Sequence, residues 1–187
     1  EVCARLFVDA SGLKGSLRKS LVSMADIWPD IAPSDLCAAA QYVMKIHSMD
    51  DARAFLETTN LRDREAMGWL GVHGGFSLLR VHVDLEHEEV SLLTGSIAEQ
   101  GTPSGKRILQ DFVDRHDWIG DAKFGGSRVI PLRRPYSVLG AGRIALIGDS
   151  ASQVFAPHGS GIAMGMLGGL HLASAVEKVL AEHGDIG

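Results

Sequence analysis

Cysteine is scarce in this chain, and strong charge of either sign is missing. Only Cys3 and Cys37 occur among 187 residues, which excludes a disulfide framework and any site with four thiolate ligands. The formal net charge of -5 provides no strongly basic surface, so we expect no nucleic-acid partner. Few cysteines and no signal-peptide pattern fit a reducing compartment, and we therefore expect a cytoplasmic protein.

No uninterrupted apolar run is long enough to cross a membrane convincingly. The least polar stretch, residues 159–176, contains Ser160, His171 and Ser174 and several glycines. Its glycines four residues apart match the spacing of a membrane-helix dimer motif, but the polar interruptions favour a water-soluble helix. Hydrophobic residues at 45% and charged residues at 22% are typical of a folded domain with a core, and 22 glycines are an excess.

Two buried strands are predicted, one near each end of the chain. Residues 6–8 form a short apolar run that stops at a glycine turn, and residues 143–147 form another that stops at Gly148-Asp149. Between them, antiparallel-type strands are predicted over 69–84 (broken at Gly74-Gly75), 90–94 and 128–132, while 38–46 fits a strand or a helix. Helices are predicted from Asp50 to Leu56, after Ser104, and from Gly161 to about Glu182.

This order of elements predicts an α/β protein, α+β overall, in which one domain is split by an insertion. The first part of the split domain covers residues 1–20, and its late strand and long helix cover residues 137–187. The inserted, mainly antiparallel β domain covers residues 21–136. Because the chain opens almost directly onto a strand, we expect it to be part of a longer protein.

The strongest chemical signal follows the second buried strand. Gly148 and Asp149 lie where a parallel strand ends, which is the edge of an open α/β sheet where ligands bind. Gly159 and Gly161 open the long helix, whose free N–H groups and positive dipole end favour an anionic group. A carboxylate that accepts sugar hydroxyls, beside a helix start that stabilises a negative ring, suits a flavin.

These residues carry a resemblance to a known family. Gly148-Asp149-Ser150-Ala151 with the 157–161 segment Pro-His-Gly-Ser-Gly resembles the second flavin motif of the p-hydroxybenzoate hydroxylase superfamily of FAD-dependent oxidoreductases. Residues 8–18, which include Asp9 and Gly12, resemble its middle motif. The pairing is most similar to the geranylgeranyl reductase branch. The resemblance implies part of a Rossmann-like FAD-binding domain with an inserted antiparallel substrate domain.

The chain departs from the family pattern in two places. The GxGxxG motif of the first βαβ unit is absent, so we expect this fragment alone to be inactive. In the middle motif, Ser11 precedes Gly12, and Gly15 stands where the family has serine.

The resemblance implies a set of roles for residues and partners. FAD is the expected cofactor, with NAD(P)H or another reductant as electron donor. The cofactor-binding residues are expected to be Asp9, Gly12, Gly148, Asp149, Pro157, Gly159, Ser160 and Gly161. His158, beside the expected flavin edge, is a candidate catalytic proton donor, although a loop histidine that binds backbone explains it as well.

Three activities remain open at this point. The resemblance implies reduction of isoprenoid carbon–carbon double bonds, or hydroxylation of an aromatic or polyketide substrate. A truncated, non-catalytic domain that binds no cofactor is the alternative from another class. If the protein reduces isoprenoids, we expect a small apolar substrate and peripheral contact of the protein with a membrane. The oligomeric state is not predicted.

Three further groups of residues have ordinary explanations. His73, His82, Asp84 and His87 lack the spacing of a zinc site, so we expect no metal and interpret them as exposed hairpin residues. The aromatic residues of the insertion suit an apolar pocket or the core equally well; they are Trp69, Phe76, Trp118 and Phe124. Four apolar residues of the last helix are predicted to lie in the core; they are Met164, Met166, Leu167 and Leu170.

Overall fold

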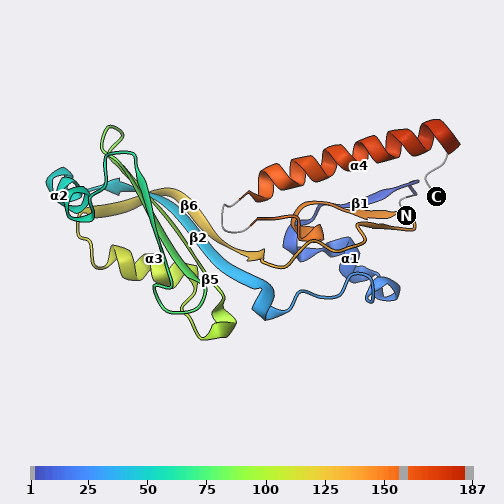
Figure 1. Cartoon of the computed structure of the whole chain (residues 1–187), viewed down its shortest axis with the longest axis horizontal. Helices are drawn as coiled ribbons and strands as arrows, with labels where there is room; N and C mark the ends of the chain where they lie inside the picture. The colour runs from blue at the N-terminus through green and yellow to red at the C-terminus, as the bar shows by residue number, and fades with distance from the viewer. Residues whose placement is uncertain (1–2, 156–159, 184–187) are drawn as a thin grey trace. The chain divides into compact units, whose positions relative to one another are not determined.

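The chain forms two compact units, one of which is built from two separated segments. The structure is a computed structural model that describes residues 3–155 and 160–183. Glu1–Leu36 and Ile130–Gly187 make up the first unit, here called the split unit, and Cys37–Val129 make up the second, here called the insert unit. Figure 1 labels the elements of both. Whether these units are the predicted FAD-binding and substrate domains stays a prediction.

The split unit is built around a three-stranded mixed sheet of order β1-β8-β7. Strand β1 pairs in parallel with β8, and β7 pairs antiparallel with β8. The long helix α4 packs against the turn η5 that follows β8. The elements are β1 (Phe7–Asp9), η1 (Gly12–Lys14), α1 (Ser16–Ser20), η2 (Val22–Met24), η3 (Pro33–Asp35), β7 (Gly140–Ala141), β8 (Ile144–Leu146), η5 (Gly148–Ala151) and α4 (Gly161–His183).

The core of the split unit is small. Its buried hydrophobic cluster consists of Trp28, Tyr136, Leu146 and Ala151. Trp28 donates its indole N–H to the carbonyl of Val138 at 2.8 Å, and the Tyr136 hydroxyl donates to the carbonyl of Pro29 at 2.6 Å. These two bonds satisfy the polar ends of buried aromatic side chains, as such residues require.

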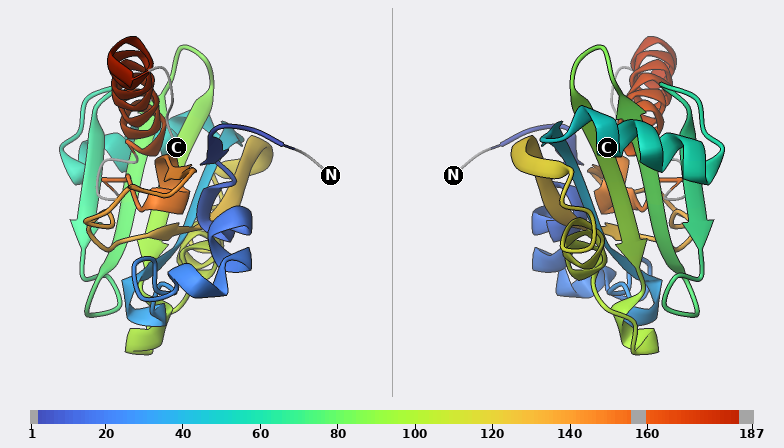
Figure 2. Two further views of the ribbon diagram at one scale, coloured as in Figure 1. Left: turned by 90° about the vertical axis from the view of Figure 1, so that its right-hand side faces the viewer. Right: turned by 90° about the vertical axis from the view of Figure 1, so that its left-hand side faces the viewer.

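The insert unit is a five-stranded antiparallel sheet of order β3-β4-β5-β2-β6 with two main helices. Both helices lie in front of the strands in the right-hand view of Figure 2. The elements are β2 (Leu36–Ile46), α2 (Met49–Thr59), β3 (Ala66–Leu70), β4 (Ser77–Asp84), β5 (Glu89–Ser96), η4 (Ala98–Gln100), α3 (Gly105–Val113) and β6 (Ile119–Pro131).

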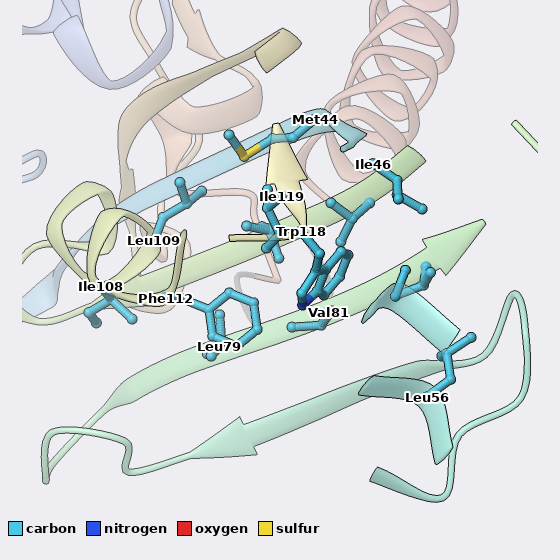
Figure 3. Packing of buried hydrophobic residues seen from close by; sticks show 14 of the residues in the cluster. Met44, Ile46, Leu56, Leu79, Val81, Ile108, Leu109, Phe112, Trp118 and Ile119 are labelled. Carbon is cyan, nitrogen blue, oxygen red and sulfur yellow. The ribbon is translucent and has the colours of Figure 1, made fainter. Parts of the chain in front are cut away.

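The core of the insert unit lies between the sheet and these helices (Figure 3). Val81 and Leu92 from the sheet and Phe112 from α3 belong to one buried cluster. The start of α3 lies so close to the sheet that a Cβ on Gly105 would come within 2.5 Å of the Ala38 carbonyl oxygen. Only glycine therefore permits this approach of helix to sheet.

Several sequence predictions can be checked against these elements. The ambiguous segment 38–46 is a strand, because its alternate residues pack into the core while β5 pairs along its edge. The helix predicted to start at Asp50 begins at Met49, and Ser48 caps it by accepting a hydrogen bond from the N–H of Asp51. The strand predicted at 128–132 begins much earlier, at Ile119.

The predicted burial of four apolar residues in the last helix is wrong. Met166, Leu167 and Leu170 are 72%, 49% and 62% exposed, and Met164 is 38% exposed. Helix α4 is apolar around most of its surface, but among the described elements it packs mainly against η5, so much of that surface is exposed. Within the part of the chain that the structure describes, no helix meets the length and hydropathy needed to cross a membrane.

Candidate functional site

A pocket of about 540 Å³ lies in the split unit, where the parallel strands β1 and β8 end. Residues that follow the two strands form one wall; they are Ala10, Gly12, Ile147, Gly148 and Asp149. The first two turns of α4 form another; they are Gly161, Ile162, Gly165 and Met166. The carboxyl ends of parallel strands and a helix start therefore meet at this pocket, an arrangement typical of ligand sites in α/β proteins.

Glycine is favoured by the backbone at the turn after β8, and two glycines of the facing helix lie close to that turn. Gly148 has a φ of +66°, a left-handed conformation that side chains disfavour. A Cβ on Gly165 would lie 3.6 Å from the Cα of Gly148, and one on Gly161 would lie 3.5 Å from Oδ1 of Asp149. The helix thus passes close to the turn, and at its glycines the backbone is exposed to the pocket.

Two side chains hold this turn in place. Oε1 of Gln153 accepts a 2.8 Å hydrogen bond from the N–H of Gly148. The buried hydroxyl of Ser150 donates to the carbonyls of Asp9 and Ile147 at 2.5 and 2.8 Å. Ser150 therefore ties the end of β1 to the end of β8, the two strands whose ends border the pocket.

Asp149 is the only acidic side chain on the pocket wall among the described residues. Burial raises the pKa of its carboxyl above the ordinary value. Among residues 3–155 and 160–183, no group donates a hydrogen bond to this carboxylate and no cation pairs with it. A half-buried acceptor without a partner is costly, and a ligand that donates hydrogen bonds would remove that cost.

Asp9 has a different environment from Asp149, although Asp9 ends β1 and Asp149 follows β8 in the same sheet. Its buried carboxylate accepts hydrogen bonds from the hydroxyl and N–H of Ser11 at 2.6 and 3.0 Å. It also accepts from the N–H groups of Leu17 and Arg18 at 3.0 and 2.8 Å. Burial alone would raise the pKa of Asp9, but these bonds outweigh it and hold the pKa below the ordinary value. Asp9 thus fixes the start of α1.

The structure brings together part of the predicted cofactor-binding set. Gly12, Gly148, Asp149 and Gly161 line one pocket. Ser160 lies at the start of α4, where its carbonyl accepts a hydrogen bond from the N–H of Met164 at 3.0 Å. Pro157, His158 and Gly159 lie outside the described residues. The assignment of all these residues to a cofactor stays a prediction.

The sequence analysis missed the apolar part of the pocket wall. Ile130, Val154, Ile162 and Met166 contribute to it, and none stands in a recognisable motif. It also missed Gln153, whose role as an acceptor for the Gly148 N–H depends on the folded turn. The sequence could have indicated this role of Gln153 only by its polar side chain and its position five residues after Gly148.

The histidine group of the insert unit does not form a metal site. Among the described residues, no group of three or more histidine, cysteine, aspartate or glutamate side chains is placed to hold a metal ion. His87 instead contacts Asp84 through Nδ1 at 2.9 Å near the β4–β5 turn. Trp118 is buried in the core and Trp69 packs against it, whereas Phe124 is 65% exposed.

Comparisons with known proteins show the fold. No protein-family model matches the sequence, and no curated protein matches it. A geranylgeranyl bacteriochlorophyll reductase-like protein from Thermoplasma acidophilum is similar in structure, with a TM-score of 0.71 at 17% identity over 95% of this chain and 42% of that one. PqsL from Pseudomonas aeruginosa, a probable FAD-dependent monooxygenase, has a TM-score of 0.58 at 14% identity over 95% of this chain and 47% of that one.

The predicted fold class is confirmed by these likenesses. The chain has an α/β architecture with a mainly antiparallel sheet and a smaller mixed sheet, a fold that it shares with parts of these two proteins. It spans less than half the length of either solved chain.

Proposed function

We propose that this chain carries the flavin-contacting part of an FAD-dependent oxidoreductase. The observation that supports the proposal best is the Asp149 carboxylate, which has a raised pKa and no partner among the described residues, in a pocket at the ends of parallel strands. The resemblance of the Gly148-Asp149 and 157–161 segments to a flavin motif and the shared fold point to the same cofactor.

The residues of the pocket fit the flavin end of such a cofactor. Asp149 is an acceptor-only group when ionised, as the hydroxyls of a ribityl chain require. The glycines at 148, 161 and 165 let a flat ring approach the backbone closely. The first N–H groups of α4 have no acceptor within the helix and favour a negatively charged edge.

A bound flavin would supply hydride-transfer chemistry. The chain's own groups would bind and orient: Asp149 accepts the ribityl hydroxyls, while Gly12 and the 9–12 turn held by Asp9 border the cofactor. Ile147, Val154 and Met166 give the pocket wall apolar surface. His158 and its neighbours Pro157 and Gly159 would lie at the ring edge, with His158 donating a proton to the substrate.

For the reaction, we propose reduction of a carbon–carbon double bond in an isoprenoid, with NAD(P)H or another reductant as electron source. Anaerobic incubation of reduced, flavin-loaded protein with a polyprenyl substrate should consume the double bond. A cytoplasmic protein that contacts the membrane peripherally would meet such a substrate. A fully flavin-loaded protein that leaves the polyprenyl compound unchanged would contradict the substrate assignment.

Hydroxylation is the second candidate, because the chain shares its fold with PqsL, a probable FAD-dependent monooxygenase. The two reactions differ in their use of oxygen. Substrate-dependent oxygen consumption in the presence of NAD(P)H would favour the monooxygenase. Its absence, together with anaerobic turnover, would favour the reductase.

The cofactor itself is tested by titrating FAD into the purified protein and recording the visible absorption spectrum. We expect Asp149→Ala to weaken FAD binding by about tenfold or more, because a hydrogen bond to a charged group contributes about 1.5–3 kcal/mol. Asp117→Ala, an exposed carboxylate of the insert unit, is the matched control and should bind as the wild type. A wild type that binds no FAD would leave the non-catalytic domain as the better description.

A further inference from the structure

Another pocket of the split unit lies beside α1, has a volume of about 270 Å³ and shares no residue with the pocket at Asp149. The residues that line it are Leu13, Arg18, Lys19, Asp30, Ile31 and Leu36. Pockets for drug-sized ligands span about 300–1,000 Å³, so this one suits a smaller molecule or one group of a larger molecule. Two of its lining side chains are cations and one is an anion, which leaves the pocket with a net positive charge.

Arg18 places a buried positive charge at this pocket. Its side chain is only 2% exposed. Nη1 donates to the carbonyls of Trp28 and Pro29 at 3.4 and 3.2 Å, whereas the buried Nε has no partner among the described residues. A guanidinium has five N–H donors, so these two bonds leave most of them unused by the described residues. Carbonyl groups carry no formal charge, and a buried cation is costly unless an anion pairs with it.

Glycine at position 15 allows the guanidinium to lie where it does. A Cβ on Gly15 would come within 2.9 Å of both Nε and Nη2 of Arg18. A side chain at this position would therefore displace the guanidinium. The motif that residues 8–18 resemble has serine at position 15, so that motif does not account for this placement of the charge.

Asp30 is the one acidic side chain among the residues that line this pocket, and it pairs only loosely with the cations. Its Oδ1 lies 3.7 Å from Nη1 of Arg18 and 3.9 Å from Nζ of Lys19. Both distances are too long for a hydrogen bond. The Asp30 side chain is 80% exposed, so little packing holds it in place. A single oxygen thus lies between two cations without bonding to either, where an anion with several oxygens could bond to both.

A third cation adds to the positive potential of this region. The Cζ atom of Arg133 lies 4.2 Å from the ring centroid of Tyr136, and the Cζ atom of Arg18 lies 5.5 Å from the same centroid. The Tyr136 hydroxyl donates to the carbonyl of Pro29, to which Arg18 also donates. Among the residues that the structure describes, no carboxylate pairs with Arg133, whose Nε donates to the carbonyl of Arg134 instead. The excess of positive charge is therefore not confined to the pocket wall.

We propose that this pocket binds a phosphate group in place of the Asp30 carboxylate. A phosphate monoester carries three acceptor oxygens and about two negative charges, so Arg18 and Lys19 can each donate to a different oxygen. Asp30 moves into the solvent to which it is already largely exposed, and acts as an internal competitor of the ligand. The ligand is inorganic phosphate or the phosphate of a small monoester, because both present the same acceptor oxygens. The proposal goes beyond the flavin function and does not depend on it.

The test is an NMR titration of the flavin-free full chain with sodium phosphate, glycerol 3-phosphate or sodium chloride at matched ionic strength. We expect saturable amide shifts centred on Lys19, Asp30 and Ile31 with the two phosphates and none with chloride. Tighter binding of glycerol 3-phosphate would identify a monoester as the ligand, and tighter binding of inorganic phosphate would identify the free ion. Shifts that do not saturate, or that chloride reproduces, would overturn the proposal.

Two substitutions of exposed residues should change the phosphate affinity in opposite directions. Lys19→Gln should weaken binding by about fivefold or more, because it removes one charge-assisted hydrogen bond. Asp30→Asn should strengthen binding by about threefold, because it removes the competing charge of a loose, exposed ion pair. Lys14→Gln and Asp26→Asn are the matched controls, since both residues are exposed, lie in the same part of the chain and do not line the pocket. Changes of equal size in the controls, or no gain in Asp30→Asn, would overturn the proposal. Because no flavin is present and the two pockets share no residue, failure here would leave the FAD proposal standing.

Discussion

The two units distribute apolar and polar groups in opposite ways. The insert unit buries one continuous cluster between a sheet and two helices, while the split unit buries only a four-residue cluster and leaves apolar residues of α4 exposed. The split unit instead concentrates glycines, short strands and a carboxylate that has no partner among the described residues around its pocket. We infer that the buried core of the insert unit supplies stability. The split unit has less buried apolar packing, and its pocket stays accessible to a ligand.

The largest effect is expected in the core of the insert unit. Phe112→Ala should lower the free energy of unfolding by about 3–5 kcal/mol, because it opens a cavity under β4 and β5. Phe112 also stacks on His116 at 4.0 Å and contacts Phe55 edge-on. Denaturant titration followed by tryptophan fluorescence measures the change. Phe124→Ala, at a 65% exposed position of β6, should cost less than about 1 kcal/mol.

In the split unit, the largest effect is expected at Asp9 rather than at an apolar residue. Asp9→Ala leaves the N–H groups of Ser11, Leu17 and Arg18 without their acceptor, and should cost about 2–3 kcal/mol. Fluorescence of Trp28, in a variant that lacks the other two tryptophans, reports on this unit. A loss as small as that of an exposed substitution would contradict the assigned role.

The same residue should make the split unit sensitive to acid. The pKa of Asp9 is lower in the folded chain than the ordinary value of 3.8, so its contribution is present above pH 3.8 and is lost as the pH falls through the folded pKa. The destabilisation caused by Asp9→Ala should therefore shrink on acidification below pH 3.8. A pH-independent difference would show that the hydrogen bonds do not favour the ionised form.

At Asp149 the pH dependence of stability should have the opposite sign. Its pKa is raised by burial, so the wild type loses stability as the pH rises from 3.8 through the raised value. Asp149→Asn removes that loss and should stabilise the protein by about 0.5–1 kcal/mol at neutral pH, with the gain vanishing at low pH. Thermal unfolding from pH 3 to 8 measures this. FAD affinity of the wild type should rise over the same range, since the ionised form accepts the hydroxyls.

The smallest effect is expected on the uncovered surface of α4. Leu170→Gln should change the free energy of unfolding by no more than about 0.5 kcal/mol, because Leu170 is already 62% exposed. A loss comparable to that of Phe112→Ala would show that α4 is covered in solution and would remove the contrast between the units. Analytical ultracentrifugation at several protein concentrations would show whether a second copy of the chain covers α4.

The features that the sequence predicts well are those with local signals. An apolar run that ends in Gly148-Asp149 and a glycine-bearing helix start identify β8 and α4 almost at their observed bounds. The long early part of β6 escapes prediction because it is an edge strand with mostly exposed side chains, so it shows no apolar alternation. Whether a strand lies at the edge depends on how the strands of the sheet pair, and the sequence of the strand itself does not indicate it.

Buried charges are the other class that sequence reasoning misses. Arg18 is 4% exposed, and its guanidinium donates to the carbonyls of Trp28 and Pro29 at 3.4 and 3.2 Å. Its burial depends on carbonyl groups ten and eleven residues away, which the local sequence does not reveal. In contrast, the strand end before Asp149, which the local sequence singled out, does border a pocket in the structure, and its use as a ligand site stays a prediction.

The pairing of β1 with β8 has a consequence for the order of folding. Phe7 lies opposite Ile144, so the split unit joins segments that are far apart in the chain, whereas β4 and β5 pair through a short turn. Closing a long loop costs more conformational entropy and slows folding. On a ribosome, β1 emerges early, but its partner β8 is synthesised only after the whole insert unit. The insert unit is thus expected to fold first, and the pocket to assemble last.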